Sequence, residues 1–206
     1  AKKVVAVEKD RDIIPVLEDI TRDFENICII NDDVLKLDIE NLQQSHFRSS
    51  FKVIANLPYY ITSPIIMKII QNRHLIKLAV IMVQKEVAQR LTALPGKKDY
   101  GILSIAVQLY SDVDMICEVS REAFLPSPKV DSAVVRLIIK DEPRVKIHDV
   151  DLYFKVVEAS FAERRKTIRN SLKRRLTLPY LPKAAIDNAL SIAGIDPLRR
   201  GETLSI

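Results

Sequence analysis

"VIANLPYYITSP", residues 53–64, begins as a short apolar run and turns polar at Asn56. A β-branched apolar run that stops at a residue of this kind is typical of a buried strand. Pro58 follows and favours a loop, since its ring fixes φ and removes the backbone N–H group. The stretch therefore predicts a strand whose carboxyl end carries an amide and two tyrosines.

Strand and helix patterns alternate on both sides of this stretch. Strands are expected at 3–8, 27–38 (with its acidic turn), 51–56, 77–84, 113–120 and 132–140, and helices at 10–20, 63–73, 85–94 and 100–111. Alternating units predict an α/β fold with a mostly parallel sheet, and the final strand pair predicts an antiparallel edge. After Lys140 only helices are expected, at 149–162, 165–176 and 182–193. We therefore predict two domains, 1–140 and 141–206.

Composition excludes several classes of protein. The 206 residues are 48% hydrophobic and 29% charged, which indicates a folded chain rather than a disordered one. No apolar run approaches the roughly 18 residues that span a bilayer, so no membrane segment is expected. Cys28 and Cys117 are interpreted as reduced core residues. The three histidines lack metal-ligand spacing, so neither a zinc nor an iron site is expected.

Basic residues are concentrated in one segment, "ERRKTIRNSLKRR" (163–175). It holds seven basic residues and one acid, whereas the whole chain carries +5, so the remainder is close to neutral. A concentrated basic helix is an electrostatic footprint for the phosphates of a nucleic acid. The alternative is a solvated helix face that binds nothing.

Polar residues stand where three predicted strands end: Glu8, Asp32-Asp33 and Asn56. Ligands of open α/β sheets bind at the carboxyl ends of the strands. Glu8 can accept hydrogen bonds from both hydroxyls of a ribose, and a carboxylate at Asp32-Asp33 can accept from an adenine amino group. Each acid alone is also typical of a turn or a helix cap. Three polar ends in register predict a nucleoside-containing cofactor laid across the sheet.

The "NLPYY" loop, residues 56–60, has the groups needed to present an amine for methylation. The side-chain oxygen of Asn56 and the carbonyl of Leu57 can each accept one hydrogen of an adenine amine, which turns the nitrogen lone pair toward a sulfonium methyl group. Pro58 fixes the loop, and Tyr59 offers a ring on which an adenine that has left its stack can lie. The alternative is a proline turn whose tyrosines pack in the core.

Two loops resemble the motifs of a known family. "NLPYY" resembles the N-x-P-Y/F motif of adenine-N6 methyltransferases that use S-adenosylmethionine, and "FLPSPKVDSAVVRL" (124–137) resembles the second signature of the ribosomal RNA adenine dimethyltransferases. "VVAVEKD", "NDDVLKLD" and the ending "AGIDPLRRGETLSI" are also similar to that family. The resemblance implies a Rossmann-like methyltransferase sheet followed by a small all-helical domain that binds RNA.

The resemblance also implies roles for individual residues. The implied catalytic residues are Asn56, Leu57, Pro58, Tyr59 and Phe124, with Tyr59 and Phe124 sandwiching the flipped adenine. The implied cofactor-binding residues are Glu8 for the ribose and Asp33 for the adenine, with Val34 and Asn56. The implied RNA-binding residues are Arg164, Arg165, Lys166, Arg169 and Lys173. Bacterial members dimethylate two adjacent adenosines near the 3′ end of small-subunit (16S) ribosomal RNA, late in subunit assembly. We accordingly expect a monomeric, metal-free cytoplasmic enzyme that acts on the small ribosomal subunit.

One departure from the family is large. Family members begin with a strand that ends in a glycine-rich loop, E-x-G-x-G, around the methionine end of the cofactor. The four glycines here all lie after Glu8, at 96, 101, 194 and 201. That strand is central in the family, so we expect this chain to lack it and to show a gap between its first two strands and its third. A smaller departure is Asp32, which replaces the glycine usual before the adenine-binding acid.

Two alternatives stay open at this point. One is the related methylase of large-subunit RNA that gives antibiotic resistance, although "NLPYY" and "FLPSPKVDS" favour the small-subunit enzyme. The other is a ribosome-assembly factor that contacts RNA without methylating it. A measurement of cofactor binding would separate the second alternative from an enzyme.

Overall fold

The computed structural model describes residues 1–163, 165–177 and 183–206. The strands are β1 (Val4–Glu8), β2 (Ile27–Asn31), β3 (Phe51–Asn56), β4 (Ile76–Gln84), β5 (Ser111–Val119) and β6 (Ser132–Ile139). The helices are α1 (Ile14–Thr21), α2 (Ile39–His46), α3 (Thr62–Gln71), α4 (Lys85–Thr92), α5 (Ile102–Gln108), α6 (Val150–Phe161), α7 (Ile168–Arg175) and α8 (Lys183–Ile192). Short 3₁₀ helices cover Tyr59–Ile61, Arg121–Ala123 and Gly201–Thr203. Among the described helices, none has the length and apolar character needed to cross a membrane.

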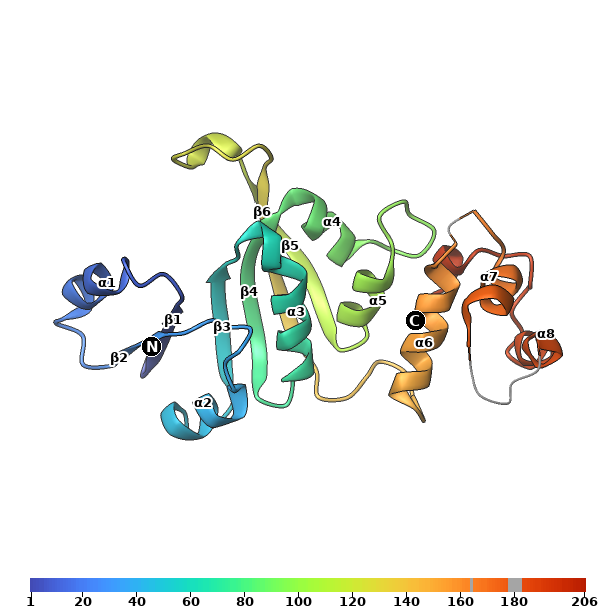
Figure 1. Ribbon diagram of the computed structural model, residues 1–206, viewed down its shortest axis with the longest axis horizontal. Helices are drawn as coiled ribbons and strands as arrows, with labels where there is room; N and C mark the ends of the chain where they lie inside the picture. The colour runs from blue at the N-terminus through green and yellow to red at the C-terminus, as the bar shows by residue number, and fades with distance from the viewer. Residues whose placement is uncertain (164, 178–182) are drawn as a thin grey trace.

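The strands form two separate sheets (Figure 1). Four strands pair in the order β3-β4-β6-β5, with β3 and β4 parallel and the other two pairings antiparallel. The predicted antiparallel edge is therefore confirmed, but this sheet is mixed rather than mostly parallel as predicted. β1 and β2 pair in parallel with each other and, within the described residues, with no other strand. The expected gap between the first two strands and the third is therefore present.

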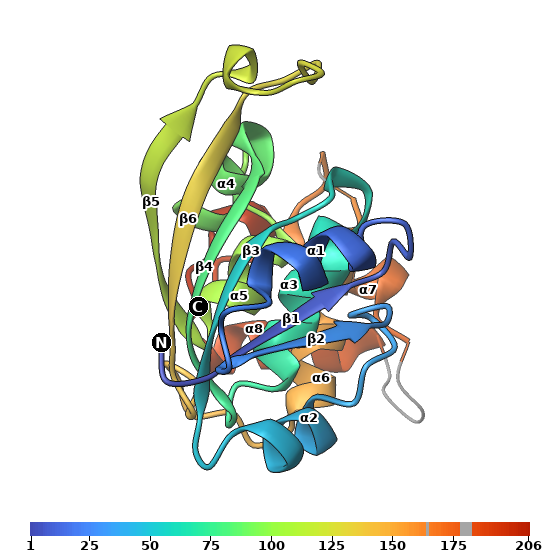
Figure 2. The same ribbon diagram turned by 90° about the vertical axis from the view of Figure 1, so that its left-hand side faces the viewer.

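The main core lies on one face of the four-stranded sheet. Helices α3, α4 and α5 cover this face, whereas none of the described helices lies on the opposite face (Figure 2). Ile66 of α3, Leu91 of α4 and Ile81 of β4 are fully buried there. On the bare face, Ile54 of β3 is 85% exposed. The sheet is thus a two-layer structure in which burial on one side supplies most of the apolar stabilisation.

The N-terminal unit, residues 1–33, packs loosely. No residue of β1, α1 or β2 is buried. Val16 and Ile20 of α1 are 59% and 63% exposed, although their spacing places both on one helix face. Because few apolar contacts hold this unit, it is expected to open at a much lower free energy than the β4–β6 core.

Two details of the predicted secondary structure are wrong. The sequence patterns missed α2, whose residues "IENLQQSH" include too few apolar side chains to show a helical period. Its start was nevertheless encoded, because the carboxylate of Asp38 caps the helix by accepting from the backbone N–H of Asn41 at 3.0 Å. The helix predicted at 100–111 spans only Ile102–Gln108, and strand β5 begins at Ser111.

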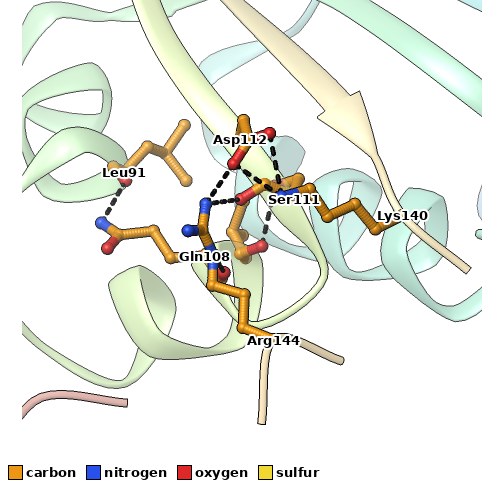
Figure 3. A network of polar contacts seen from close by, with 7 residues as sticks. Leu91, Gln108, Ser111, Asp112, Lys140 and Arg144 are labelled. Atoms are coloured by element: carbon orange, nitrogen blue, oxygen red, sulfur yellow. Dashed lines mark hydrogen bonds and ion pairs between the residues drawn. The ribbon is translucent and has the colours of Figure 1, made fainter. Parts of the chain in front are cut away.

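Arg144 anchors the segment between β6 and α6 (Figure 3). Its guanidinium donates to the carbonyl of Gln108 at 2.6 Å and to that of Ser111 at 3.1 Å, and it pairs with Asp112, which Lys140 also contacts at 3.0 Å. This network fixes where the chain leaves the sheet and enters the helical region.

The helical region has its own small core and also touches the main one. Ala159, Leu172 and Leu190, from α6, α7 and α8, pack together, whereas Tyr153 and Phe154 at the start of α6 pack against the main core. Helix α6 therefore contributes to both cores. The division into 1–140 and 141–206 stays a prediction.

Candidate active site

The loop after β3 is held rigidly by its own backbone. Pro58 has φ −58°, and its carbonyl accepts from the backbone N–H of Ile61 and from the hydroxyl of Thr62, both at 3.1 Å. Thr62 is the first residue of α3 and is 2% exposed. The "NLPYY" loop is therefore tied to a buried helix end, which suits a site that must hold a fixed geometry.

Asn56 presents its amide to solvent at the end of β3. Its side chain is exposed, and in the described part of the chain no residue hydrogen-bonds to that amide. Leu57 is 4% exposed, and its backbone N–H donates to the carbonyl of Met82 at 3.1 Å. The buried Leu57 side chain anchors the backbone, so that the Asn56 amide remains available to a ligand.

A hydrogen bond joins the two signature loops. The hydroxyls of Tyr59 and Ser132 lie 2.8 Å apart, and Ser132 is 1% exposed. The strand register explains this contact. Ser132 begins β6 opposite Gln84, the last residue of β4, and the parallel strand β3 ends at the same edge of the sheet, just before Tyr59. Tyr60, by contrast, is 80% exposed. The alternative in which both tyrosines pack in the core is therefore wrong, and Ser132 is a candidate site residue that the sequence did not single out.

Phe124 lies in the loop between β5 and β6, which projects beyond the sheet (Figure 1). Two hydrogen bonds to Asp131 fix the base of this loop. Its carboxylate accepts from the backbone N–H of Arg121 at 3.1 Å, and its carbonyl accepts from the backbone N–H of Lys85 at 2.9 Å. Phe124 itself is half-buried, and its neighbour Leu125 is fully exposed. The structure thus brings the Phe124 loop to the strand end that carries Tyr59, whereas the ring sandwich stays a prediction.

Of the four predicted cofactor residues, Glu8, Asp33 and Val34 lie at or just after the ends of β1 and β2, whereas Asn56 ends β3 in the other sheet. Glu8 and Asn31 are register partners, and the amide of Asn31 donates to the carbonyl of Glu8 at 2.9 Å. One carboxylate oxygen of Glu8 accepts from the backbone N–H of Asp10 at 2.7 Å. Val34 follows in the next loop and packs against the main core. A carboxylate pair at one strand edge is the expected arrangement for the hydroxyl and amine groups of a nucleoside.

Asp33 is kept ionised by its neighbours. Its pKa is lowered first by the hydrogen bond from the backbone N–H of Leu35 (3.0 Å) and then by the one from Lys9, whose ammonium lies 3.0 Å from the other carboxylate oxygen. The pKa of Lys9 is raised, mainly by Asp33 and to a smaller extent by Tyr60. The Lys9–Asp33 ion pair therefore links the ends of β1 and β2 at this edge.

Comparison with known proteins shows the family to which the chain belongs. The family model described as ribosomal RNA adenine dimethylase matches residues 1–204. The chain belongs to this adenine dimethylase family. A relative from Anoxybacillus flavithermus, named ribosomal RNA small subunit methyltransferase A, is 49% identical over all of this chain and 70% of its own length. A relative of the same name from Geobacillus sp. (strain WCH70) is 50% identical over all of this chain and 72% of its own length.

Solved structures support the same assignment of the adenine dimethylase fold. A dimethyladenosine transferase from Plasmodium falciparum is 28% identical, with a TM-score of 0.82, over all of this chain and 78% of that one. The 23S rRNA methyltransferase ErmE is 26% identical, with a TM-score of 0.67, over 98% of this chain and 79% of that one. The predicted α/β methyltransferase fold is thus confirmed.

The basic segment of this adenine dimethylase family member is largely engaged in ion pairs. Arg169 binds the carboxylate of Asp187 through two bonds of 2.6 and 2.8 Å, and Lys173 binds the same group at 2.7 Å. Arg165 and Lys166 are exposed and, among the described residues, have no ion-pair partner. Arg164, also predicted to bind RNA, lies outside the described residues. The segment therefore joins α7 to α8 through Asp187, and Arg165 and Lys166 are left without an ion pair to any described residue.

Proposed function

We propose that this chain transfers methyl groups from S-adenosylmethionine to N6 of two adjacent adenosines near the 3′ end of 16S ribosomal RNA. Its partner in this proposal is the small ribosomal subunit during assembly. The observation that carries the proposal is the convergence of the two signature loops through the Tyr59–Ser132 hydrogen bond, beside a free Asn56 amide.

The residues at the ends of β1 and β2 fit an S-adenosylmethionine-type cofactor. One carboxylate oxygen of Glu8 remains without a hydrogen-bond partner among the described residues and can accept from ribose hydroxyls. Asp33 can accept from the adenine amine once Lys9, which is 66% exposed, yields its position. Val34 offers an apolar contact to the base. When bound, the cofactor supplies an electrophilic methyl group.

The residues of the loop act on the target amine. The Asn56 side-chain oxygen and the Leu57 carbonyl each accept one N–H of the adenine N6 group, which holds the nitrogen in one orientation. Pro58 keeps both acceptors in place through its carbonyl bonds to Ile61 and Thr62. Tyr59 and Phe124 hold the base between their rings, and stacking of this kind contributes roughly 1–3 kcal/mol per base. The proposed catalysis is positioning and preorganised polarity rather than general-base chemistry.

Asn56→Ala in the full-length enzyme tests this proposal. We expect the single-turnover methylation rate on an RNA hairpin with the paired adenosines to fall by about 100-fold or more, the scale for losing a preorganised polar group. RNA affinity, measured separately, should hardly change, because the tyrosine and phenylalanine rings remain. Tyr59→Ala should lower both affinity and rate.

Asn188→Ala is the matched control, since Asn188 is an exposed asparagine on α8. A normal methylation rate for Asn56→Ala would mean that "NLPYY" is only a structural turn. Methylation of large-subunit RNA in place of the 16S hairpin would favour the antibiotic-resistance activity. RNA binding without any methylation would favour an assembly factor.

A further inference from the structure

Lys68 crosses from α3 to the loop that follows β2. Its ammonium donates to the carbonyl of Leu35 at 2.9 Å and to the carbonyl of Leu37 at 2.5 Å. The two acceptors stand 33 and 31 residues away in sequence. A charged donor shared by two carbonyls is among the stronger hydrogen-bond arrangements, and Lys68 is only partly exposed.

The loop that Lys68 holds is the one that carries the predicted adenine contacts. Asp33 organises the loop from inside, since its carboxylate accepts from the N–H of Leu35 and its carbonyl accepts from the N–H groups of Lys36 (2.8 Å) and Leu37 (3.1 Å). The peptides of Leu35 and Leu37 are therefore bonded to Asp33 on one side and to Lys68 on the other. Movement of their carbonyls would move Asp33 and Val34 as well.

The helix that supplies Lys68 begins at the target loop. Helix α3 starts at Thr62, whose hydroxyl bonds to Pro58, and it is well anchored because Ile65, Ile66, Ile69 and Ile70 are buried. Since β1 and β2 do not pair with the four-stranded sheet, the N-terminal unit gains no strand contact to that body within the described residues. One rigid helix thus contacts the "NLPYY" loop at its start and the cofactor loop at Lys68.

We propose that Lys68 is a positioning residue for the cofactor, which fixes the loop carrying Asp33 and Val34 at a set place relative to the "NLPYY" loop. This inference rests on the proposed function, in which that loop holds the adenine of S-adenosylmethionine. Without the ammonium, the loop samples other arrangements, and the apparent dissociation constant rises in inverse proportion to the competent fraction.

The test compares Lys68→Met with Lys68→Arg in the full-length enzyme. We expect Lys68→Met to weaken binding of S-adenosylmethionine and of S-adenosylhomocysteine by about tenfold in calorimetry, the effect of a competent fraction near one tenth. Amide hydrogen exchange should accelerate in residues 35–38 and stay unchanged in β4. RNA affinity and the melting temperature should change little. Lys68→Arg, which keeps a donor for the carbonyls, should retain most of the cofactor affinity.

Asp33→Asn separates failure of this inference from failure of the proposed function. If Asp33→Asn weakens cofactor binding and Lys68→Met leaves it within twofold, the positioning role is wrong and the cofactor assignment stands. If neither substitution weakens binding, the cofactor assignment fails and the inference falls with it. A parallel loss of cofactor affinity, RNA affinity and melting temperature in Lys68→Met would show a residue needed only for folding, and would also overturn the proposal.

Discussion

Tyr59 and Ser132 are the residues through which the two signature loops make contact. Tyr59 is half-buried, and its hydroxyl is the group that reaches the buried hydroxyl of Ser132 at 2.8 Å. A buried hydroxyl that loses its partner costs about 1–3 kcal/mol, whereas removing both partners costs much less. Substitutions at this pair can therefore separate what the hydrogen bond contributes to the free energy of unfolding from what the tyrosine ring contributes.

We predict strong coupling between Tyr59→Phe and Ser132→Ala. Tyr59→Phe keeps the ring but leaves the buried hydroxyl of Ser132 without its hydrogen-bond partner. It should therefore lower the free energy of unfolding by about 1–2 kcal/mol. The double variant should be less destabilised than the sum of the two single variants, by about 1 kcal/mol in a denaturant double-mutant cycle. Tyr60→Phe is the control, because Tyr60 is 80% exposed and should show no coupling to Ser132. Additive losses would mean that the bond does not form in solution.

At the scale of secondary structure, two side chains of α7 that are predicted to bind RNA also join this helix to α8. Asp187 of α8 binds Arg169 and Lys173 of α7, and the α7 residues Leu172 and Ile168 pack in the small helical core. The charged side chains thus complete an interface whose centre is apolar. Two of the predicted RNA-binding residues therefore also contribute to the stability of the helical region.

The stability from Asp187 should depend on pH in a defined direction. Its pKa is lowered first by the hydrogen bond from Arg169 and then by that from Lys173. A carboxylate with a lowered pKa stabilises the fold fully above its unfolded pKa of about 3.9, and this contribution is lost as the pH falls through the folded pKa.

Asp187→Asn should therefore reduce the free energy of unfolding by a constant amount between pH 7 and pH 5, and the difference from the unmodified chain should shrink below about pH 4. Denaturant titrations at several pH values measure this difference. Glu158→Gln, an exposed carboxylate on α6, is the control and should show no such dependence. A difference that persists unchanged to pH 2 would rule out an ion-pair contribution.

In the basic segment, Arg165 should contact RNA phosphates directly, whereas Arg169 and Lys173 should do so only when they are released from Asp187. Arg165 is exposed and has no partner among the described residues, so Arg165→Gln should reduce the slope of log affinity against log salt by about one. Asp187→Asn should do the opposite and steepen the slope, because it releases Arg169 and Lys173 for phosphates. Binding isotherms at several salt concentrations measure both. Equal slopes in all three proteins would identify the segment as a solvated helix face.

The strand ends were the most predictable elements, and helices with weak apolar patterns were the least. Glu8, Asp33 and Asn56 could be placed because an apolar run that stops at a polar residue marks the edge of a sheet whatever the tertiary context. Helix α2 could not be placed, since Asp38 gives a cap but the following residues give no period. The roles of Ser132 and Lys68 depend on contacts between segments 73 and at least 31 residues apart, which no local pattern encodes.

At the scale of the whole molecule, the chain consists of a well-packed four-stranded body and a loosely held N-terminal unit. The proposed site draws on both, because Asn56 and Tyr59 belong to the body while Glu8 belongs to the unit. Among the described residues, no strand lies between β1 and β3 to fix their spacing. The target-base half of the site is consequently more rigid than the cofactor half.

This asymmetry predicts that residues 1–206 alone bind S-adenosylmethionine weakly. A cofactor that contacts Glu8 on one side and Asn56 on the other must order two bodies that, within the described residues, share no sheet hydrogen bonds, and this ordering reduces the observed affinity. The protein expressed from the complete reading frame should bind at least about tenfold more tightly if it supplies a strand between β1 and β3. Calorimetry on the two proteins measures this ratio.

Hydrogen exchange provides the internal check, because amides of β1 and β2 should exchange rapidly in residues 1–206 and become protected in the longer protein, with β4 protected in both. Equal affinities together with slow exchange in β1 would show that the N-terminal unit is already fixed against the body, and that the separation of the two sheets does not limit cofactor binding.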